Sequence, residues 1–594
     1  MSQELQILRV LTNVRALKTP LEKYSHLIAL LVRPRHTRCV LRPAAQRSSD
    51  SAIPSTSTSA QERNERLFYA ALLAHPDELK PFVYAPTVGQ ACQKYGLLFR
   101  RPRGLFITVA DRGRVYSLLK NWPEKQVRLI CVTDGERVLG LGDLGIQGMG
   151  IAASKVVCYT AFGGIDPATA LPVTIDVGTD NEALLEDPFY IGLRHKCASG
   201  YWCPSRVCSF PHLPPFRSLH LLRRVRGELY DELIDEFIQA AKRRWGTGVI
   251  FQFEDFSNAN GLRLLNAYRA ETCAFNDDIQ GTAASMLGGI LAALPSLRPG
   301  GLAGQTFLFA GAGETGAGMA DLLAAAISKA TRRPLPEARR SIWMFDSQGL
   351  VTRQRAQDLG DHKLPWAHPC PEGLPNGGVG CNLVDAVNAV KPSCLIGIRR
   401  HKFSYEGTSR LAGTSSRAAL FTPDVLVAMA SHNGAPGRPL VFALSRPVEN
   451  SECTAKEAYD ATQGRVIYAS GCLMPPVIQS DGSVQAPLNS SSCYIFPGVA
   501  LGAVMSGARH IRDDALIAAA EALAGRVTEA DRAAGSVYPP FKDIREVSAH
   551  VARAVAAAVY DAGLASAGPR PRDLLVTARK WQWAPEYRLF GADR

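Results

Sequence analysis

Residues 306–328, TFLFAGAGETGAGMADLLAAAIS, and residues 341–350, SIWMFDSQGL, decide the fold of this chain. In order, they are typical of an apolar strand, a glycine-rich turn, a helix and a second apolar strand. In such a unit the glycines permit a tight turn and let a pyrophosphate group approach the N-terminus of the helix. The pattern predicts a Rossmann-type dinucleotide-binding unit whose turn contains Gly311, Gly313 and Gly316.

The ends of this unit indicate further cofactor contacts. Asp346 ends the second strand, where an acid accepts hydrogen bonds from a ribose, and Glu314 lies within the glycine turn. A second glycine motif, GLGDLG at residues 140–145, has the same spacing but does not lie between a strand and a helix. We therefore assign this second motif a packing role.

The rest of the chain extends the α/β pattern in both directions. From about Gly104, apolar runs such as VRLICVTDG and ALPVTIDVG alternate with helix-like stretches, as in a largely parallel sheet. The first hundred residues and the tail have apolar positions three and four apart, which indicates helices. A chain of 594 residues is too long for one core. We expect a helical domain (1–102), a catalytic α/β domain (103–276 and 492–555), a Rossmann-type domain (277–491) and a C-terminal extension (556–594).

Three segments differ from their surroundings: residues 31–60, 197–223 and 399–411. They carry charges of +4, +3 and +3, together +10 of the net +13. A nucleic-acid groove instead interleaves basic and aromatic residues along ordered elements, so we expect no nucleic-acid partner. No apolar run approaches the roughly 18 residues of a membrane span, so we expect no membrane partner.

The 14 cysteines lie largely in apolar stretches such as VRLICV, which suits buried thiols in a reducing compartment. The alternative is a zinc site within the second of these segments, formed by Cys197, Cys203, Cys208 and His212. That spacing contains no paired CxxC and is not a common zinc pattern, so buried thiols are favoured.

Two acidic clusters predict a metal site. VIFQFEDF delivers Glu254 and Asp255 at the end of one apolar run, and AFNDDIQGTA delivers Asp277 and Asp278 after the next. The ordinary explanation is solvated acids at strand ends, but the apolar flanks place these charges where leaving them unpaired is costly. Carboxylates without histidine or cysteine nearby favour Mg²⁺ or Mn²⁺ over Zn²⁺.

Three further residues have ordinary explanations when each is taken alone. Tyr84 in VYAPTVG fits a buried ring, and Arg137 in TDGERVLGLGDLG fits a surface cation. Lys155 in GMGIAASKVVCY precedes another apolar stretch, so we expect it on a buried helix, where a neutral amine is easier to reach.

Taken in order, TDGERVLGLGDLG, IDVGTDN at residues 175–181, FEDF, FNDDIQGTA and GAGETGAG resemble the motifs of malic enzymes. The resemblance runs from about Lys18 to the last fifty residues and is interrupted by the three segments named above. It implies oxidative decarboxylation of malate to pyruvate and carbon dioxide, with a divalent cation and reduction of NAD or NADP.

The resemblance also implies a role for each matching residue. The metal ligands it implies are Glu254, Asp255 and Asp278. Lys155 is similar to the base that takes the C2 hydroxyl proton, with Asp277 as its ion-pair partner. Tyr84 resembles the acid that protonates C3 after decarboxylation, and Arg137 resembles the residue that holds a malate carboxylate.

Departures from the family's motifs fall in the substrate pocket. Arg446 in FALSRPVEN replaces the asparagine of an LSNP motif, and Ser491 and Ser492 replace two asparagines before YIFPG. The family's ASGSPF motif is here ASGCLMPP. We expect Arg446 and Ser492 to contact the substrate and Ser492 to weaken malate binding. The alternative function is that of a catalytically impaired homologue acting as a regulatory subunit.

The cofactor preference is expected to be NADP rather than NAD. Ser347 follows Asp346 where many NAD-using relatives have lysine, and its hydroxyl is able to donate to a 2′-phosphate. Lys363 in DHKLPWAH resembles the residue of NADP-using relatives, and a cation there pairs with the 2′-phosphate. Asp346 by itself favours NAD as a ribose acceptor.

Assembly and location follow from the resemblance alone. We expect a homodimer or homotetramer, in the cytoplasm or in an organelle such as a mitochondrion or plastid. The sequence begins later than its relatives do, so we expect a truncated N-terminus.

Overall fold

The computed structural model describes residues 3–31, 56–98, 104–193, 224–398, 419–434, 437–479 and 481–586. The three charged segments lie almost wholly outside these ranges, and so does the candidate zinc site at Cys197, Cys203, Cys208 and His212. Side chains before residue 65 in the second range are likewise not described.

The N-terminal region is helical, as its periodicity predicts. Thr19 and Glu22 form a capping box at the start of the second helix, which satisfies backbone N–H groups that have no partner within the helix. The helices are α1 (Gln3–Ala16), α2 (Pro20–Ala29), α3 (Thr56–Ala74), α4 (Pro76–Val83), α5 (Thr87–Gln93) and α6 (Tyr95–Leu98).

A five-stranded parallel sheet follows, with the strand order β1-β3-β2-β4-β5. Its strands are β1 (Leu105–Thr108), β2 (Leu129–Thr133), β3 (Ala170–Asp176), β4 (Ile250–Phe253) and β5 (Ala274–Asn276). Both faces of this sheet are covered, which explains why β2, β3 and β4 are buried along their whole length. The connecting helices are α7 (Val115–Leu119), α8 (Met149–Cys158), α9 (Glu182–Glu186), α10 (Glu228–Trp245) and α11 (Asn258–Tyr268).

The second sheet has the order β14-β11-β10-β9-β6-β7-β8, and all neighbours are parallel except β7 and β8. Its strands are β6 (Phe307–Ala310), β7 (Ile342–Asp346), β8 (Gly349–Leu350), β9 (Cys394–Gly397), β10 (Leu440–Ala443), β11 (Ile467–Ser470) and β14 (Leu488–Asn489). Strands β12 (Val477–Ile478) and β13 (Val484–Gln485) form a separate hairpin. The helices here are α12 (Thr282–Ala293), α13 (Glu314–Thr331), α14 (Leu335–Ala338), α15 (Leu383–Val390), α16 (Pro423–His432) and α17 (Ala455–Thr462).

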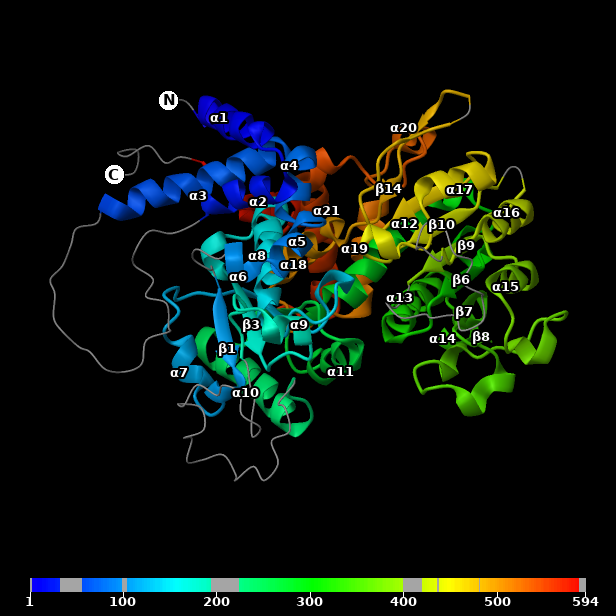
Figure 1. The fold of residues 1–594 in the computed structure, drawn as a ribbon, viewed down its shortest axis with the longest axis horizontal. Coiled ribbons are helices and arrows are strands. Elements are labelled where there is room, and N and C mark those ends of the chain that lie inside the picture. Colours follow the sequence, from blue (N-terminus) through cyan, green and yellow to red (C-terminus); the bar gives the residue numbers. More distant parts are fainter. Residues whose placement is uncertain are drawn as a thin grey trace.

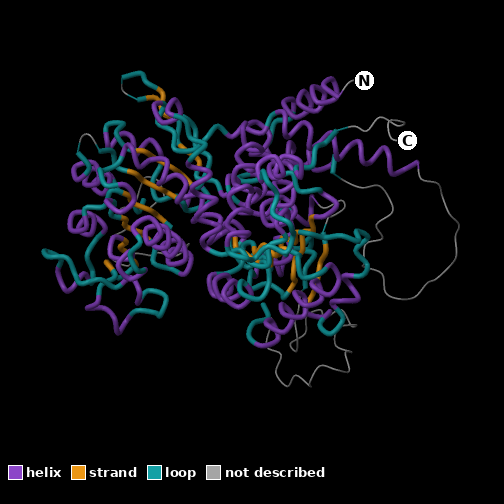
Figure 2. The backbone as a smooth tube through the Cα atoms, turned by 180° about the vertical axis from the view of Figure 1, so that it is seen from behind, coloured by secondary structure: helices purple, strands orange, loops and turns teal. Residues whose placement is uncertain are grey.

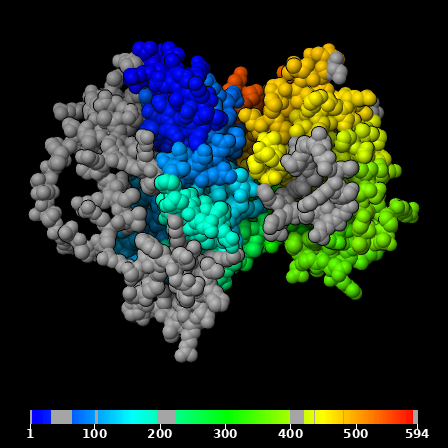
Figure 3. Space-filling model, viewed as in Figure 1, coloured from blue at the N-terminus to red at the C-terminus, as the bar shows by residue number. Residues whose placement is uncertain are grey.

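The last helices connect the two sheets. They are α18 (Phe496–Ser506), α19 (Asp513–Ala524), α20 (Glu529–Ala533), α21 (Ile544–Asp561) and α22 (Leu574–Trp581). Helix α21 packs on α18 and α19, and α19 packs on α12. Figures 1 and 2 show the two sheets in separate lobes, with α18, α19 and α21 in the region between them. Figure 3 shows the lobes in contact on the face in view. One buried apolar cluster contains residues of both sheets and of these helices.

The architecture confirms the expected α/β class with a Rossmann-like unit. Within the described ranges, no helix is long and apolar enough to cross a membrane.

Candidate active site

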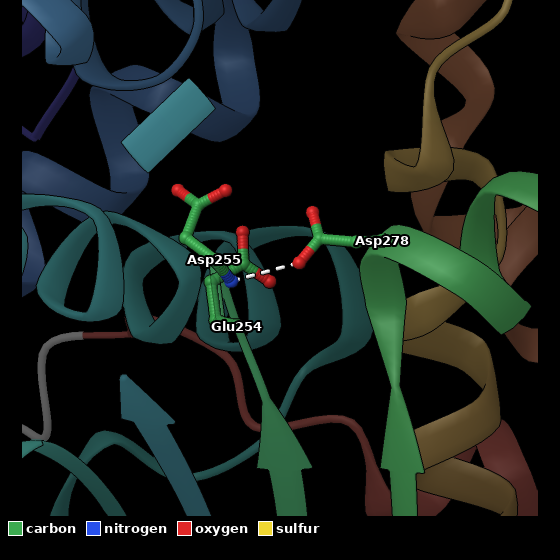
Figure 4. Close-up of side chains that lie close together, drawn as sticks. All are labelled: Glu254, Asp255 and Asp278. Atoms are coloured by element: carbon green, nitrogen blue, oxygen red, sulfur yellow. Dashed lines mark hydrogen bonds between the residues drawn. The ribbon is translucent and has the colours of Figure 1, made fainter. Parts of the chain in front are cut away.

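The acidic clusters meet at the carboxyl ends of two adjacent parallel strands. Glu254 and Asp255 directly follow β4, and Asp278 lies in the π-helical turn η6 (Asp277–Gly281) that follows β5. One oxygen from each of Glu254, Asp255 and Asp278 lies within 4.8 Å of the others. Figure 4 shows these three side chains close together. The amide of Asp255 donates to Asp278 Oδ2 at 2.7 Å, which orients the two segments.

These three carboxylates fit a hard divalent cation. Burial is the largest cause that raises the pKa of each of them, and the neighbouring carboxylates raise it further. Three acids gathered in a water-poor site repel one another unless a cation compensates their charge. Oxygen ligands without histidine or cysteine in this cluster suit Mg²⁺ or Mn²⁺.

Lys155 lies beside this cluster on α8, fully buried, as its apolar surroundings predict. Its Nζ donates to Asp277 and lies 3.1 Å from Glu254 Oε1. The expectation of an easily neutralised amine is wrong for this arrangement. Burial lowers the pKa of Lys155, but the carboxylates of Asp277 and Glu254 oppose it, and the net pKa lies well above the usual value. The buried carboxylates therefore decide the protonation of the amine.

Tyr84 caps α4, buried, facing the same lysine. Lys155 Nζ lies 5.4 Å from the centre of the Tyr84 ring, and the phenol oxygen has no hydrogen-bond partner among the described residues. Burial raises the pKa of Tyr84 well above its usual value. The phenol is therefore protonated near neutral pH and has a proton to give.

A cavity of about 250 Å³ opens beside the acids. Its lining joins the two lobes and consists of Arg137, Leu139, Gly140, Gly142, Asp255, Phe256, Asp278, Thr282, Thr315, Met319, Ile398, Leu444, Ser445, Arg446, Asn450 and Ser490. The Arg137 guanidinium donates to Asn258 Oδ1. By contrast, the Arg446 guanidinium makes no hydrogen bond or ion pair with a described residue, so it is available to an anion.

Ser492 does not line this cavity. Its hydroxyl donates to Asp277 Oδ2 at 2.7 Å, so it belongs to the buried Lys155–Asp277 pair rather than to the open pocket. A serine is too short to extend past Asp277, whereas the contact with that carboxylate matches its length.

The glycine turn between β6 and α13 has the geometry that its spacing predicts. Gly311 has φ +135°, and a Cβ there would lie 2.1 Å from the Ile398 carbonyl oxygen. A Cβ on Gly316 would lie 2.2 Å from the Gly311 carbonyl oxygen, so the helix packs closely on the turn. Gly313 has open space around it at the N-terminus of α13. The cradle fits a dinucleotide pyrophosphate.

At the charged end of the predicted cofactor site, Asp346 has a basic partner that the sequence did not indicate. Asp346 ends β7, and its two carboxylate oxygens accept hydrogen bonds from Arg355 Nη2 at 2.8 and 3.0 Å, while Oδ2 also accepts from Lys363 Nζ at 2.6 Å. These bonds lower the pKa of Asp346 despite its burial. Ser347 is exposed beside it, and Glu314 is half-buried with one carboxylate oxygen lacking a partner among the described residues.

Comparisons with known proteins show the family of this chain. The family described as "Malic enzyme, NAD binding domain" matches residues 279–560, and "Malic enzyme, N-terminal domain" matches residues 61–205 and 219–269. The chain belongs to the malic enzyme family. It is 44% identical to "NADP-dependent malic enzyme 3" of Arabidopsis thaliana, over 99% of this chain and 86% of that protein. A chloroplastic NADP-dependent malic enzyme of Zea mays is also 44% identical, over 99% of this chain and 79% of that protein.

Solved malic enzymes share the fold. The crystal structure of the Entamoeba histolytica malic enzyme matches with a TM-score of 0.53 and 19% identity, over 90% of each chain. That of Pyrococcus horikoshii matches with a TM-score of 0.50 and 19% identity, over 93% of this chain and 94% of that chain.

Some residues of this malic enzyme's site carried no signal in the sequence. Arg355 follows Asp346 by nine positions in an ordinary polar stretch, and only the fold buries it against that acid. Asn258, which accepts a hydrogen bond from Arg137, and Ser490, which lines the cavity, likewise lie in polar stretches without a recognisable motif.

The second glycine motif has more than the packing role that its position suggests. Gly140 packs against the Arg446 carbonyl, but Gly140 and Gly142 both line the cavity. Both residues have positive φ, so the turn that carries Arg137 depends on them.

Proposed function

We propose that this chain is a divalent-metal-dependent malic enzyme. It oxidises and decarboxylates (S)-malate to pyruvate and carbon dioxide and reduces NADP⁺ in preference to NAD⁺. The observation that carries the proposal is the buried acidic cluster of Glu254, Asp255 and Asp278 beside Lys155, at a cavity shared with the helix of the glycine turn. Oxidation, decarboxylation and protonation need a cation, a base, an acid and a cofactor, and the site offers a place for each.

Four side chains move protons or position the groups that do. In its neutral form, which a cation held by the acids would favour by offsetting the carboxylate charge that raises the pKa of the amine, Lys155 takes the proton of the malate C2 hydroxyl as the C2 hydride leaves for the nicotinamide. Asp277 holds Nζ in place, and Ser492 in turn holds Asp277. Tyr84 gives its phenol proton to C3 once carbon dioxide has left. When held by the three acids, Mg²⁺ or Mn²⁺ supplies positive charge that stabilises the negative charge developing on substrate oxygens.

The two arginines of the cavity bind the substrate carboxylates. Arg446 lines the cavity, no described residue accepts a hydrogen bond from its guanidinium, and a guanidinium binds a carboxylate bidentately. Arg137 also lines the cavity and is oriented by Asn258, so malate contacts two cations beside the metal ligands. In this proposal Arg446 takes the part of the asparagine that it replaces.

NADP preference rests on the charge at the end of β7. Arg355 neutralises Asp346, so Lys363 is able to pair with a 2′-phosphate without leaving the acid unpaired. The relatives of Arabidopsis thaliana, Zea mays and Phaseolus vulgaris are named NADP-dependent, which supports the same preference.

Removal of the metal tests the proposal directly. Purified protein with malate, NADP⁺ and Mn²⁺ is expected to produce NADPH, to lose this activity in EDTA and to regain it with Mn²⁺. Asp255→Ala abolishes turnover with an unchanged circular-dichroism spectrum, because two carboxylates complete neither the charge nor the geometry of the site. Glu271→Ala, an exposed acid nearby, serves as the control.

Activity that persists in EDTA contradicts metal dependence. A chain that shows no turnover at saturating malate, while binding NADP⁺ and Mn²⁺, supports the impaired regulatory homologue instead.

The assembly and location belong to the same proposal. Exposed leucines on α1 and α6, namely Leu5, Leu8 and Leu97, support a homodimer or homotetramer, which light scattering of the 64.2 kDa chain measures. Relatives of Zea mays and Flaveria pringlei are named chloroplastic, which supports a plastid location. Imaging of a fluorescent fusion expressed from the full-length transcript tests this location.

A further inference from the structure

A second cavity lies away from the acidic cluster, between the C-terminal helices. It is a groove of about 750 Å³ between α19 and α21, bordered by the end of α13, and it shares no residue with the catalytic cavity. Helices α19 and α21 pack against each other between the two lobes (Figure 1). The volume is that of a small-molecule site.

Small residues form the floor of this groove, which we call the alanine floor. Ala518, Ala522 and Gly525 come from α19 and its C-terminal end, and Ala554, Ala557 and Ala558 come from α21. Their short side chains keep the space between the helices open and leave an apolar surface on which a flat or slender group is able to lie.

The acids that line the groove are already compensated. Each has a basic partner within 4 Å: Glu521 with Lys329, Asp514 with Arg512, and Asp561 with Arg570. Along most of its length the groove therefore offers no unbalanced charge to a ligand.

Among the described residues that line the groove, basic side chains without an acidic partner of their own lie at one end. Arg526, His550 and Arg553 line this end, and neither arginine belongs to an ion pair formed by described residues. The Nε of Arg526 is buried without a hydrogen-bond partner among those residues. His550 contacts Glu546 at 3.1 Å, but that carboxylate also holds Arg579 at 2.5 Å.

The cations at this end repel one another. Burial lowers the pKa of His550, and the charges of Arg526 and Arg553 lower it further. An unpaired guanidinium beside a second one is stabilised by an anion that accepts hydrogen bonds from both.

We propose that this groove binds a small phosphate-bearing anion, with the phosphate between Arg526 and Arg553 and an apolar portion on the alanine floor. The localised charge favours a compact dianion with several acceptor oxygens over an acidic protein segment. A helical segment would need free cations along the groove, and those further along are paired. The site goes beyond the proposed malate chemistry and does not depend on it.

Calorimetric titration of the full chain tests this site, with phenyl phosphate and inorganic phosphate as probes. Saturating NADP⁺ fills the cofactor site, and the ionic strength is constant. We expect one site per chain, with phenyl phosphate binding more tightly than inorganic phosphate because its ring contacts the alanine floor. Arg526→Gln with Arg553→Gln weakens phenyl phosphate binding at least tenfold, because each arginine contributes a charged hydrogen bond.

Two comparisons separate charge from fold. Arg15→Gln with Arg263→Gln removes the same net charge from distant surface ion pairs and leaves binding unchanged. Arg526→Lys with Arg553→Lys keeps part of the affinity, and each variant retains the circular-dichroism spectrum and NADP⁺ binding of the parent. Absence of phenyl phosphate binding by the parent overturns the proposal, and so does equal binding by the Arg526→Gln, Arg553→Gln variant.

Discussion

At the residue scale, buried charge decides what Lys155 and Tyr84 do. Lys155→Ala removes the proton acceptor, so reduction of NADP⁺ by malate falls by about 10²–10⁴-fold. Tyr84→Phe leaves the first hydride transfer largely intact and slows the release of pyruvate, because only the C3 proton is missing. Single-turnover absorbance of NADPH, recorded beside pyruvate release, separates the two steps. Tyr69→Phe, at another buried tyrosine, is the control. A near-normal rate in Lys155→Ala contradicts the assignment.

The effect of Arg446 on malate binding depends on whether its guanidinium reaches the substrate. Since its guanidinium lines the cavity without a described partner, Arg446→Ala is expected to raise the KM for malate at least tenfold and to change kcat less. Steady-state kinetics with malate as the varied substrate measures this split. Arg353→Ala, at an exposed arginine of the same lobe, leaves KM unchanged. An unaltered KM in Arg446→Ala means that the guanidinium does not touch malate.

Lys363 is the residue that we expect to determine the preference for NADP⁺ over NAD⁺. Lys363→Gln removes a cation that is 2.6 Å from Asp346, so kcat/KM for NADP⁺ falls at least tenfold while that for NAD⁺ changes little. The ratio of the two constants is the measurement, and Lys456→Gln, a highly exposed lysine, is the matched control. If the ratio is constant, the 2′-phosphate is held elsewhere.

At the element scale, two glycines of the turn from β6 into α13 are expected to affect different properties. One affects the stability of the fold and the other affects cofactor binding. Gly311→Ala places a Cβ 2.1 Å from the Ile398 carbonyl oxygen at a positive φ, so it destabilises the fold by about 1–3 kcal/mol. Gly313 has φ −80°, and a Cβ there would lie 4.0 Å from its nearest neighbour, Asn258 Nδ2, so Gly313→Ala keeps the melting temperature and raises the KM for NADP⁺. Thermal melting and cofactor kinetics test the pair. If both variants lower the melting temperature equally, the assignment of stability to Gly311 and of cofactor binding to Gly313 is wrong.

At the scale of the whole molecule, the first sheet carries the proposed catalytic residues and the second carries the proposed cofactor site. The strands of the first lie within residues 105–276 and those of the second within 307–489, while α18 and α21 pack beside the first. This arrangement supports the proposal that residues 103–276 and 492–555 form a catalytic domain and residues 277–491 a cofactor domain. The catalytic cavity draws its walls from both, so substrate and cofactor meet where the lobes meet.

The sequence by itself determined the elements and their chemistry. Alternating apolar runs and helical periods located β2, β4, β6 and β7, because both patterns are local and repeat within a few residues. The acids after β4 and β5 were expected to form a metal site, because their apolar flanks make unpaired charge costly there. The glycine spacing likewise predicted the β6–α13 turn, because glycines between a strand and a helix permit a tight turn.

Only the tertiary structure decided which distant side chains meet. Lys155 and Asp277 are 122 positions apart, and only the resemblance to a family implied that they pair. Ser492 and Asp277 are 215 positions apart, and nothing in the sequence indicated their contact. The same holds for the burial of Arg355 against Asp346 and for the guanidinium of Arg446, which has no partner among the described residues. A side chain's pKa and its available hydrogen bonds depend on what surrounds it in space. Packing between the lobes determines those surroundings, and sequence periodicity does not.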